Sequence, residues 1–272
     1  MAAKKEDSGK KDVLNTRNLE SYSLGGALQQ VKTLLKGMQP DACPSILLLG
    51  VPGIGKTEGL RQVCKDLGYP LEVRHLSQVH PLDMAGVIVK DDKMQFAVSP
   101  LTQALQRLGD GKKVAFLDEL DRLQPIAQPP IFQFLLERKI NGYKSPNTYV
   151  LAAGNGQTCS YTFDLDAAMA SRLCIMRVEP DVDEWLAWGA TANIHHTILI
   201  AIVNGGIDLL NQHGTGEMKS AMKIADPRAW HNLSNALAGG FDPNNAAIFV
   251  GQNAAKAYRI WLNFDSDFST QI

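Results

Sequence analysis

A glycine-rich segment that ends in lysine and threonine is the strongest candidate for chemistry in this 272-residue sequence. Residues 50–57 read Gly-Val-Pro-Gly-Ile-Gly-Lys-Thr and match the pattern G-x-x-x-x-G-K-[ST]. Glycines let such a loop fold closely around phosphate oxygens with its N–H groups pointing inward, and a helix that begins there adds its positive end. We expect Lys56 to reach the β and γ phosphates of a nucleotide, and Thr57 to give its hydroxyl to Mg²⁺. The predicted nucleotide-binding residues are Gly50, Pro52, Gly53, Ile54, Gly55, Lys56, Thr57 and Glu58.

Two adjacent carboxylates, Asp118 and Glu119, follow an apolar run that starts at Val114. The run is typical of a buried strand, and ligands of open α/β sheets bind at the carboxyl ends of the strands. At that edge Asp118 would bind Mg²⁺ directly or through water, and Glu119 would orient and polarise the attacking water. Such a pair often only caps the next helix, but its place on a strand after the glycine-rich loop favours hydrolysis.

Asn155 follows another apolar run, residues 149–153, at the end of a predicted strand. Its amide could lie between Glu119 and the γ-phosphate and position the water. The alternative is an ordinary turn residue, because Gly154 and Gly156 flank it. The order of the strands favours the role in catalysis.

Two arginines are candidates for stabilising the charge that phosphoryl transfer spreads over the γ-phosphoryl oxygens. Arg172 directly precedes the last predicted strand. Arg228 follows Asp226 and Pro227, which suit the N-cap and first turn of a helix. Either arginine could instead be a surface or salt-bridge residue, which is the usual role of this residue type.

Strands and helices alternate up to about residue 178 and must position these side chains. Short apolar runs suited to buried parallel strands lie at 45–49, 71–74, 113–117, 149–153 and 174–178. Helical patterns lie between and before them, at about 24–35, 57–67, 99–108, 125–138 and 166–172. Two hairpins are expected, at 87–97 and 139–147. The alternation predicts an α/β fold, a P-loop NTPase parallel sheet sandwiched by helices.

A small all-helical lid domain is expected after this sheet. The predicted domains are a flexible tail at 1–16, a nucleotide-binding domain at 17–180 and the helical lid at 181–272. The lid helices are expected at about 182–190, 195–204, 206–212, 227–238 and 244–262. We expect the four tryptophans of this region to lie in the helical core rather than to form a binding platform: Trp185, Trp188, Trp230 and Trp261.

The composition is that of an ordinary soluble globular protein, with 45% hydrophobic and 20% charged residues. The net charge of −1 does not favour a nucleic-acid or anionic-membrane partner. The four cysteines form no C-x-x-C pair, so we expect reduced, mostly buried thiols rather than a zinc site. No run approaches the ~20 apolar residues of a membrane helix, and the charged start does not resemble a signal peptide. These features predict a cytoplasmic protein without a membrane partner.

With these residues in place, the chain resembles the AAA+ ATPases, and within them the MoxR-like branch found in bacteria and phages. Residues 50–57 look like the Walker A motif, 114–119 like Walker B, Asn155 like sensor 1 and 226–228 like sensor 2. Residues 117–122 are similar to the MoxR-like run L-D-E-[LI]-N-R, with Asp121 in place of the usual Asn. Segments 76–86, 151–155 and 182–188 resemble further parts of this branch. Arg172 stands where the family has its arginine finger, although Leu173 replaces the more usual Phe.

The resemblance implies a Mg²⁺-dependent ATPase that works as a homo-oligomer, a hexameric ring with ATP at the subunit interfaces. Its catalytic residues would be Lys56, Glu119, Asn155, Arg172 and Arg228. Arg172 would act on the nucleotide of the neighbouring subunit, and Arg228 would read the nucleotide state through the lid. Hydrolysis would remodel a client protein in a chaperone-like way, and a frequent companion of the family is a von Willebrand factor A domain protein.

Three alternatives remain open. The first is a DNA-directed AAA+ motor, loader or transposition regulator, which the near-neutral charge disfavours. The second is a nucleotide-gated binding subunit with little turnover, which Glu119 disfavours. The third is a small-molecule kinase, which the helical C-terminal region with Arg228 disfavours. Segment 76–98, with its hairpin, is a candidate for partner contact.

Overall fold

The computed structural model describes residues 19–80, 87–90, 93–96, 98–140, 142–155, 170–213 and 223–269. Several features expected from the sequence lie outside these residues. They are the tail 1–16, most of the helix 166–172, the end of segment 76–86, the turns at 91–92 and 141, and Cys159.

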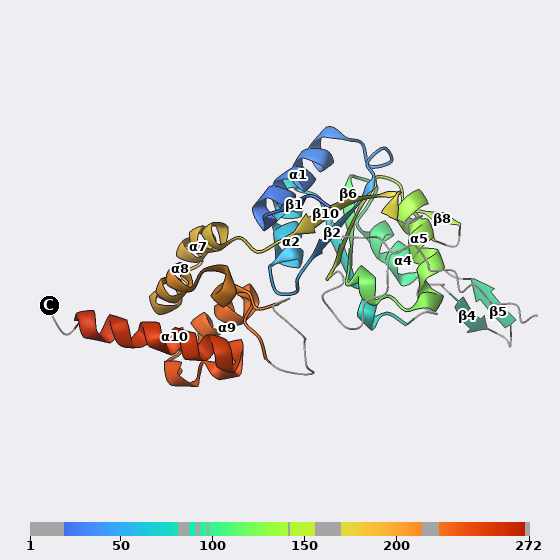
Figure 1. The fold of residues 1–272 in the computed structure, drawn as a ribbon. Helices are drawn as coiled ribbons and strands as arrows, with labels where there is room; N and C mark the ends of the chain where they lie inside the picture. The colour runs from blue at the N-terminus through green and yellow to red at the C-terminus, as the bar shows by residue number, and fades with distance from the viewer. Residues whose placement is uncertain are drawn as a thin grey trace, which may run out of the picture. The chain divides into compact units, whose positions relative to one another are not determined.

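A six-stranded sheet forms the α/β part of the chain, in the order β1-β10-β2-β9-β6-β3 (Figure 1). Strands β6 and β9 run parallel with Lys113 opposite Thr148, and β1 runs parallel to β10 with Ser21 opposite Arg177. The predicted parallel sheet is therefore confirmed. Its strands are β1 (Ser21–Tyr22), β2 (Ser45–Gly50), β3 (Leu71–His75), β6 (Lys113–Asp118), β9 (Thr148–Gly154) and β10 (Leu173–Val178).

The central strands are buried along their whole length, because their sequences are continuous apolar runs. Residues 46–49 of β2, 114–117 of β6 and 149–153 of β9 are all buried. Unbroken apolar runs of this kind are expected where helices cover both faces of a parallel sheet. Strand β1 has two residues and no such run, so the sequence did not indicate it.

Within the described residues, four helices accompany these strands, close to where the sequence predicted them. They are α1 (Leu24–Gly37), α2 (Lys56–Leu67), α4 (Pro100–Arg107) and α5 (Gln128–Glu137). Ser23 caps α1 by accepting the N–H of Gly26 at 3.1 Å, and Ser99 caps α4 in the same way. Helix α5 begins later than predicted because Pro125–Ala127 forms a separate 3₁₀ turn, η4.

Both predicted hairpins are present as short antiparallel pairs. β4 (Val87–Lys90) pairs with β5 (Lys93–Phe96), and β7 (Lys139–Ile140) pairs with β8 (Tyr143–Lys144). Two further 3₁₀ turns follow the strands β3 and β6, namely η2 (Leu76–Gln78) and η3 (Leu120–Arg122).

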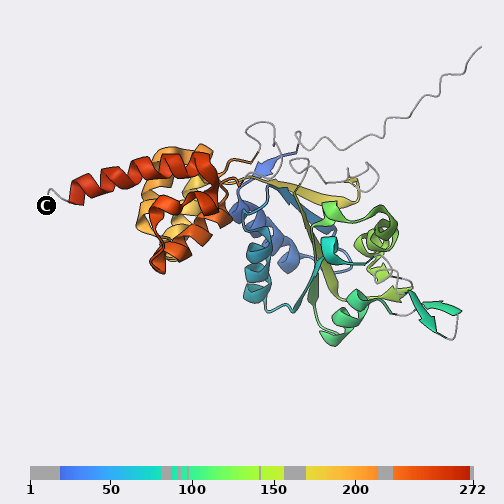
Figure 2. The same cartoon turned by 90° about the horizontal axis from the view of Figure 1, so that it is seen from below.

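The C-terminal part is helical, as predicted, and Figure 2 shows its helices in orange and red. Helix α8 is interrupted at Gly206 (φ 59°), which accounts for the two separate helices expected there. Helix α10 is kinked at Gly251, where a Cβ atom would lie 2.0 Å from the carbonyl oxygen of Lys223. The helices are α7 (Val182–Thr191), α8 (His196–Leu210), α9 (Pro227–Ala238) and α10 (Ala247–Ser269), with the short turn η6 (Pro243–Asn245).

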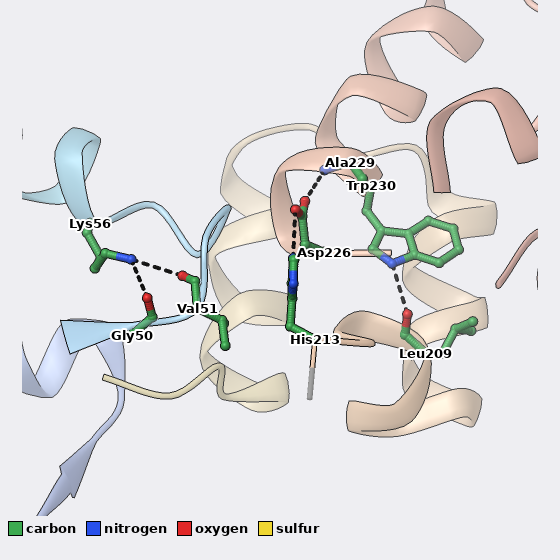
Figure 3. A network of polar contacts seen from close by, with 8 residues as sticks. All are labelled: Gly50, Val51, Lys56, Leu209, His213, Asp226, Ala229 and Trp230. Atoms are coloured by element: carbon green, nitrogen blue, oxygen red, sulfur yellow. Dashed lines mark hydrogen bonds and ion pairs between the residues drawn. The ribbon is translucent and has the colours of Figure 1, made fainter. Parts of the chain in front are cut away.

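The core of this helical part is built around Trp230. Its ring is fully buried against Tyr258, and its indole Nε1 donates to the carbonyl oxygen of Leu209 at 3.0 Å (Figure 3). Trp185 is also buried, which agrees with the expectation of a helical core. Trp188 is 42% exposed, so the expectation was wrong for this residue.

The chain separates into two compact units. One comprises residues 39–47 and 72–175, and the other comprises 20–38, 48–71 and 176–272. The glycine-rich loop and the C-terminal helices belong to the second unit, whereas Asp118, Glu119 and Asn155 belong to the first. The division of the chain at residue 180 stays a prediction.

Cys43 and Cys64 are buried free thiols, as expected from the sequence. Burial raises the pKa of both thiols, that of Cys64 to about 11. Among the described residues, no helix has the length and apolar character needed to cross a membrane.

Arg138 is a buried cation that ties the end of α5 to neighbouring main chain. Arg138 is only 6% exposed, and burial lowers the pKa of its guanidinium below the ordinary value. The guanidinium donates to the carbonyl oxygens of Leu135 and Cys43, each at 2.6 Å, and to the hydroxyl of Ser45 at 3.1 Å. The fork of donors on an arginine suits this set of acceptors.

We expect Arg138→Lys to lower the free energy of unfolding by about 2–4 kcal/mol, because an ammonium group leaves buried carbonyl oxygens unpaired. Urea denaturation followed by circular dichroism measures this loss. Arg107→Lys is the matched control, because Arg107 is exposed in the last turn of α4. Equal losses in the two variants would contradict the role of the buried network.

Candidate functional site

The glycine-rich loop connects the buried strand β2 to helix α2, as the sequence predicted. Strand β2 ends at Gly50, and α2 begins at Lys56. Gly53 (φ 82°) and Gly55 (φ 97°) lie in the left-handed region, which favours glycine. A Cβ atom on Gly50 would lie 2.3 Å from the carbonyl oxygen of Val178. Each glycine of the pattern is therefore required by the local backbone.

Lys56 folds back over this loop. Its Nζ donates to the carbonyl oxygens of Gly50 at 2.7 Å and Val51 at 2.9 Å (Figure 3). The residue is 7% exposed. A cation is thus held against the loop at the N-terminal end of α2, where the helix dipole also favours an anion.

A cavity of about 740 Å³ lies beside the loop, within the same compact unit. Its walls include Leu24 and Leu28 of α1, residues 53–55 of the loop, residues 57–59 of α2, and Trp188 of α7. The ring of Trp188 packs edge-on against that of His231, with ring centroids 5.4 Å apart. The volume is typical of a small-molecule site, and the mixture of apolar walls with a few polar groups is typical as well.

The first turn of α9 lies on the glycine-rich loop. The main-chain N–H of Arg228 donates to the carbonyl oxygen of Gly53 at 3.1 Å. Asp226 caps the helix by accepting the N–H of Ala229 at 2.7 Å, as the sequence predicted (Figure 3). Arg228 also lines the cavity, together with Thr57 and Glu58. These members of the predicted site are therefore brought together in one unit.

The two predicted carboxylates end strand β6 in the other unit. Asp118 accepts the N–H of Glu119 at 2.9 Å, and its Oδ2 lies 3.5 Å from Nδ1 of His75. Glu119 has a left-handed backbone (φ 57°, ψ 42°), which a non-glycine residue adopts rarely and often at functional sites. Its carboxylate accepts a hydrogen bond from Ser77 and lies 3.3 Å from the guanidinium of Arg122.

No pattern in the sequence predicted roles for His75, Ser77 and Arg122. Arg122 could have been found from the sequence, because it is the last residue of the run 117–122 that resembles L-D-E-[LI]-N-R. His75 and Ser77 lie at the end of β3 and in η2, and no local pattern connects them with β6.

Asn155 lies at the end of β9, next to the end of β6 in the sheet. The two strands pair with Leu117 opposite Ala152, so their carboxyl ends share one edge. The N–H of Asn155 donates to Oδ2 of Asp121 at 2.9 Å, and Asp121 is 5% exposed. The structure therefore places Asn155 and the two carboxylates at one sheet edge.

Arg172 lies exposed in the turn before β10. It belongs to the unit that contains Asp118, Glu119 and Asn155, and it is not among the residues that line the described cavity.

A family model described as AAA domain (dynein-related subfamily) matches residues 45–173. The match begins at β2 and includes the glycine-rich loop, Asp118, Glu119 and Asn155. Residues 45–173 are therefore similar to an AAA domain.

Curated relatives of the chain include replication factor C small subunits of archaea. The protein of Methanococcus maripaludis strain C5 is 25% identical over 201 residues, which cover 73% of this chain and 58% of the relative. The protein of Methanosarcina mazei is 22% identical over 228 residues, which cover 81% and 61%. The chain thus spans less than two thirds of the length of these relatives.

Among solved structures, the RuvB Holliday junction branch migration motor of Thermotoga maritima resembles the chain. The likeness covers 89% of this chain and 66% of RuvB, with 18% identity and a TM-score of 0.45. The architecture of the chain is established by its own strand order.

The contact between Asp121 and Asn155 yields a test of the sheet edge at the ends of β6 and β9. We expect Asp121→Ala to lower the free energy of unfolding by about 1–3 kcal/mol, because the buried N–H of Asn155 loses its acceptor. Asp121→Asn keeps an acceptor oxygen of the same shape and should cost clearly less. Chemical denaturation compares the two variants, and an equal loss in both would show that the N–H of Asn155 does not depend on this oxygen.

Proposed function

We propose that the protein binds ATP with Mg²⁺ and hydrolyses it, as a homo-oligomeric ring of MoxR-like type that remodels a partner protein. The observation that carries the proposal is the Lys56 ammonium, held by two carbonyl oxygens inside a glycine loop at the N-terminus of α2. A cation in such a loop and a helix dipole together favour a polyphosphate.

The cavity beside the loop supports a nucleotide rather than a simple anion. Its volume of about 740 Å³ accommodates a nucleoside next to the phosphates. Leu24, Leu28 and the exposed ring of Trp188 provide apolar surface for a base, and Arg228 provides a positive charge at the same wall. In this proposal Arg228 reports the state of the nucleotide to the C-terminal helices.

Hydrolysis is assigned to the residues at the ends of β6 and β9. Glu119 orients a water and takes its proton while the water oxygen forms a bond to the γ-phosphorus. The bond from this phosphorus to the bridging oxygen breaks, and ADP and phosphate are the products. Asn155 positions the same water through its amide.

A magnesium ion fits the chemistry of the available donors. The hydroxyl of Thr57 and the carboxylate of Asp118 are hard oxygen ligands, which Mg²⁺ prefers together with water and phosphate oxygens. When bound, the ion neutralises charge on the β and γ phosphates.

We expect the Glu119→Gln variant to bind ATP like the wild type. Its rate of phosphate release should fall by roughly 10²–10⁴-fold, because an amide does not accept the proton of the attacking water. Lys56→Ala should lose both, since the cation of the loop is gone. Isothermal titration with ATP and a phosphate-release assay separate the two effects. Glu137→Gln, at the exposed end of α5, and Lys65→Ala, in the last turn of α2, are the matched controls. Unchanged turnover in Glu119→Gln would contradict the assignment.

The ring is supported by the resemblance and by the exposure of Arg172. An exposed arginine that serves the nucleotide of a neighbour fits a heterologous interface, which closes into a ring. A hexamer is the expected size, and a protein client, such as one with a von Willebrand factor A domain, is the expected partner.

We expect the ATPase activity per subunit to rise with protein concentration and to fall on dilution, because each site needs the arginine of a neighbour. Arg172→Ala should reduce turnover by roughly 10³-fold at every concentration. Light scattering and phosphate release, measured on the same samples, compare assembly with activity. Arg107→Ala serves as an exposed control. An activity per subunit that stays constant down to the monomer would contradict the shared site.

A DNA-directed motor or loader is the second candidate, because the curated relatives are replication factor C small subunits. This function predicts that DNA stimulates phosphate release and that the effect falls steeply with salt. The remodelling of proteins predicts no such stimulation. The Glu119→Gln variant in ATP should instead retain a protein client in a pull-down.

A further inference from the structure

A carboxylate lies directly on the glycine-rich loop. A Cβ atom added to Gly53 would lie 2.5 Å from the Cγ and Oδ2 atoms of Asp226, so this carboxyl group packs on the main chain of Gly53. The N–H of Arg228 donates to the carbonyl oxygen of the same glycine at 3.1 Å. The start of α9 thus contacts the loop through main chain and through a carboxylate.

Two further contacts hold the Asp226 side chain in place (Figure 3). It accepts the N–H of Ala229 at 2.7 Å, and its Oδ2 lies 3.4 Å from Nε2 of His213. The side chains of His213 and Asp226 are only 8% and 18% exposed. The carboxylate therefore has a defined position in a partly buried place, where charges interact more strongly than in water.

The same loop is the part of the chain that attracts anions. Its N–H groups and the N-terminus of α2 favour negative charge, and Lys56 adds a cation. A polyphosphate on this loop would share that positive region with the Asp226 carboxylate. Because the two groups have like charges, each disfavours the other.

We propose that Asp226 is a built-in competitor of the nucleotide phosphates, and that nucleotide binding loosens the contact between α9 and Gly53. This inference rests on the proposed nucleotide-binding function. A change in this contact would also affect the helical core, because Trp230 lies in the same first turn of α9. The indole of Trp230 donates to the carbonyl oxygen of Leu209 and packs against the ring of Tyr258. A nucleotide would thereby bias the C-terminal helices through a charge on their own first turn.

The substitution Asp226→Asn tests the charge alone, because asparagine has the same shape and caps helices about as well as aspartate. Titration calorimetry with ADP should show binding roughly three- to tenfold tighter than in the wild-type protein. The gain should shrink as salt is raised, since salt screens the repulsion. Asp242→Asn is the matched control, because Asp242 caps η6 by accepting the N–H of Asn244 at 2.9 Å. It should leave the affinity unchanged.

Hydrogen exchange provides a second readout. In the wild-type protein, ADP should speed the exchange of the Arg228 amide, which bonds to Gly53. In Asp226→Asn the same amide should keep its protection when ADP binds. An ADP affinity that is unchanged or weaker in Asp226→Asn would overturn the inference.

The failure of the inference is distinct from the failure of the proposed function. One result would contradict only the competition. In that result the wild-type protein binds ADP, Lys56→Ala does not bind it, and Asp226→Asn binds it with the same affinity as the wild type. If wild type and Lys56→Ala bind ADP equally, or neither binds it, the nucleotide site itself is wrong, and the inference falls with it.

Discussion

The contact of the Lys56 ammonium with the carbonyl oxygens of Gly50 and Val51 is the interaction on which the rest of the site depends. It holds a positive charge inside a loop that only glycines can form, since Gly53 and Gly55 both have left-handed backbones. The buried strand β2 and the helix α2 support the two ends of this loop. Strand, loop, cation and helix dipole are therefore arranged in a way that favours the binding of an anion.

Each of the two compact units has its own set of polar contacts among the predicted site residues. Asp226 and Arg228 connect the start of α9 to Gly53, one by its carboxylate and the other by its main-chain N–H. In the other compact unit, Glu119 is contacted by Ser77 and Arg122, and Asp118 by His75. Each reactive group thus has a defined neighbour, which limits its possible orientations and suits a site with a specific chemistry.

Much of the fold could be predicted because its signals are local. The apolar runs at β2, β6 and β9 and the caps Ser23, Ser99 and Asp226 are properties of short segments. The glycine-rich loop is equally local, since its backbone requires the same glycines that the pattern names. What could not be predicted depends on contacts between distant segments. Strand β1 is defined by its pairing with β10, and the Arg138 network joins α5 to residues 43–45.

The same reason explains what was missed in the candidate site. His75 and Ser77 contact Asp118 and Glu119 across two elements that are far apart in the sequence. The exposure of Trp188 was missed because it lies one turn after the buried Trp185 on the same helix, and spacing alone does not show where the buried side of the helix ends. The residue types that do the proposed chemistry were visible, whereas the partners that orient them were not.

The most direct test of the account is the release of phosphate from ATP by the unmodified protein, measured with Mg²⁺ and with a chelator in its place. The account predicts steady turnover with Mg²⁺, which stops when the chelator removes the ion and returns when Mg²⁺ is restored. ATP binding without any Mg²⁺-dependent release of phosphate would contradict it.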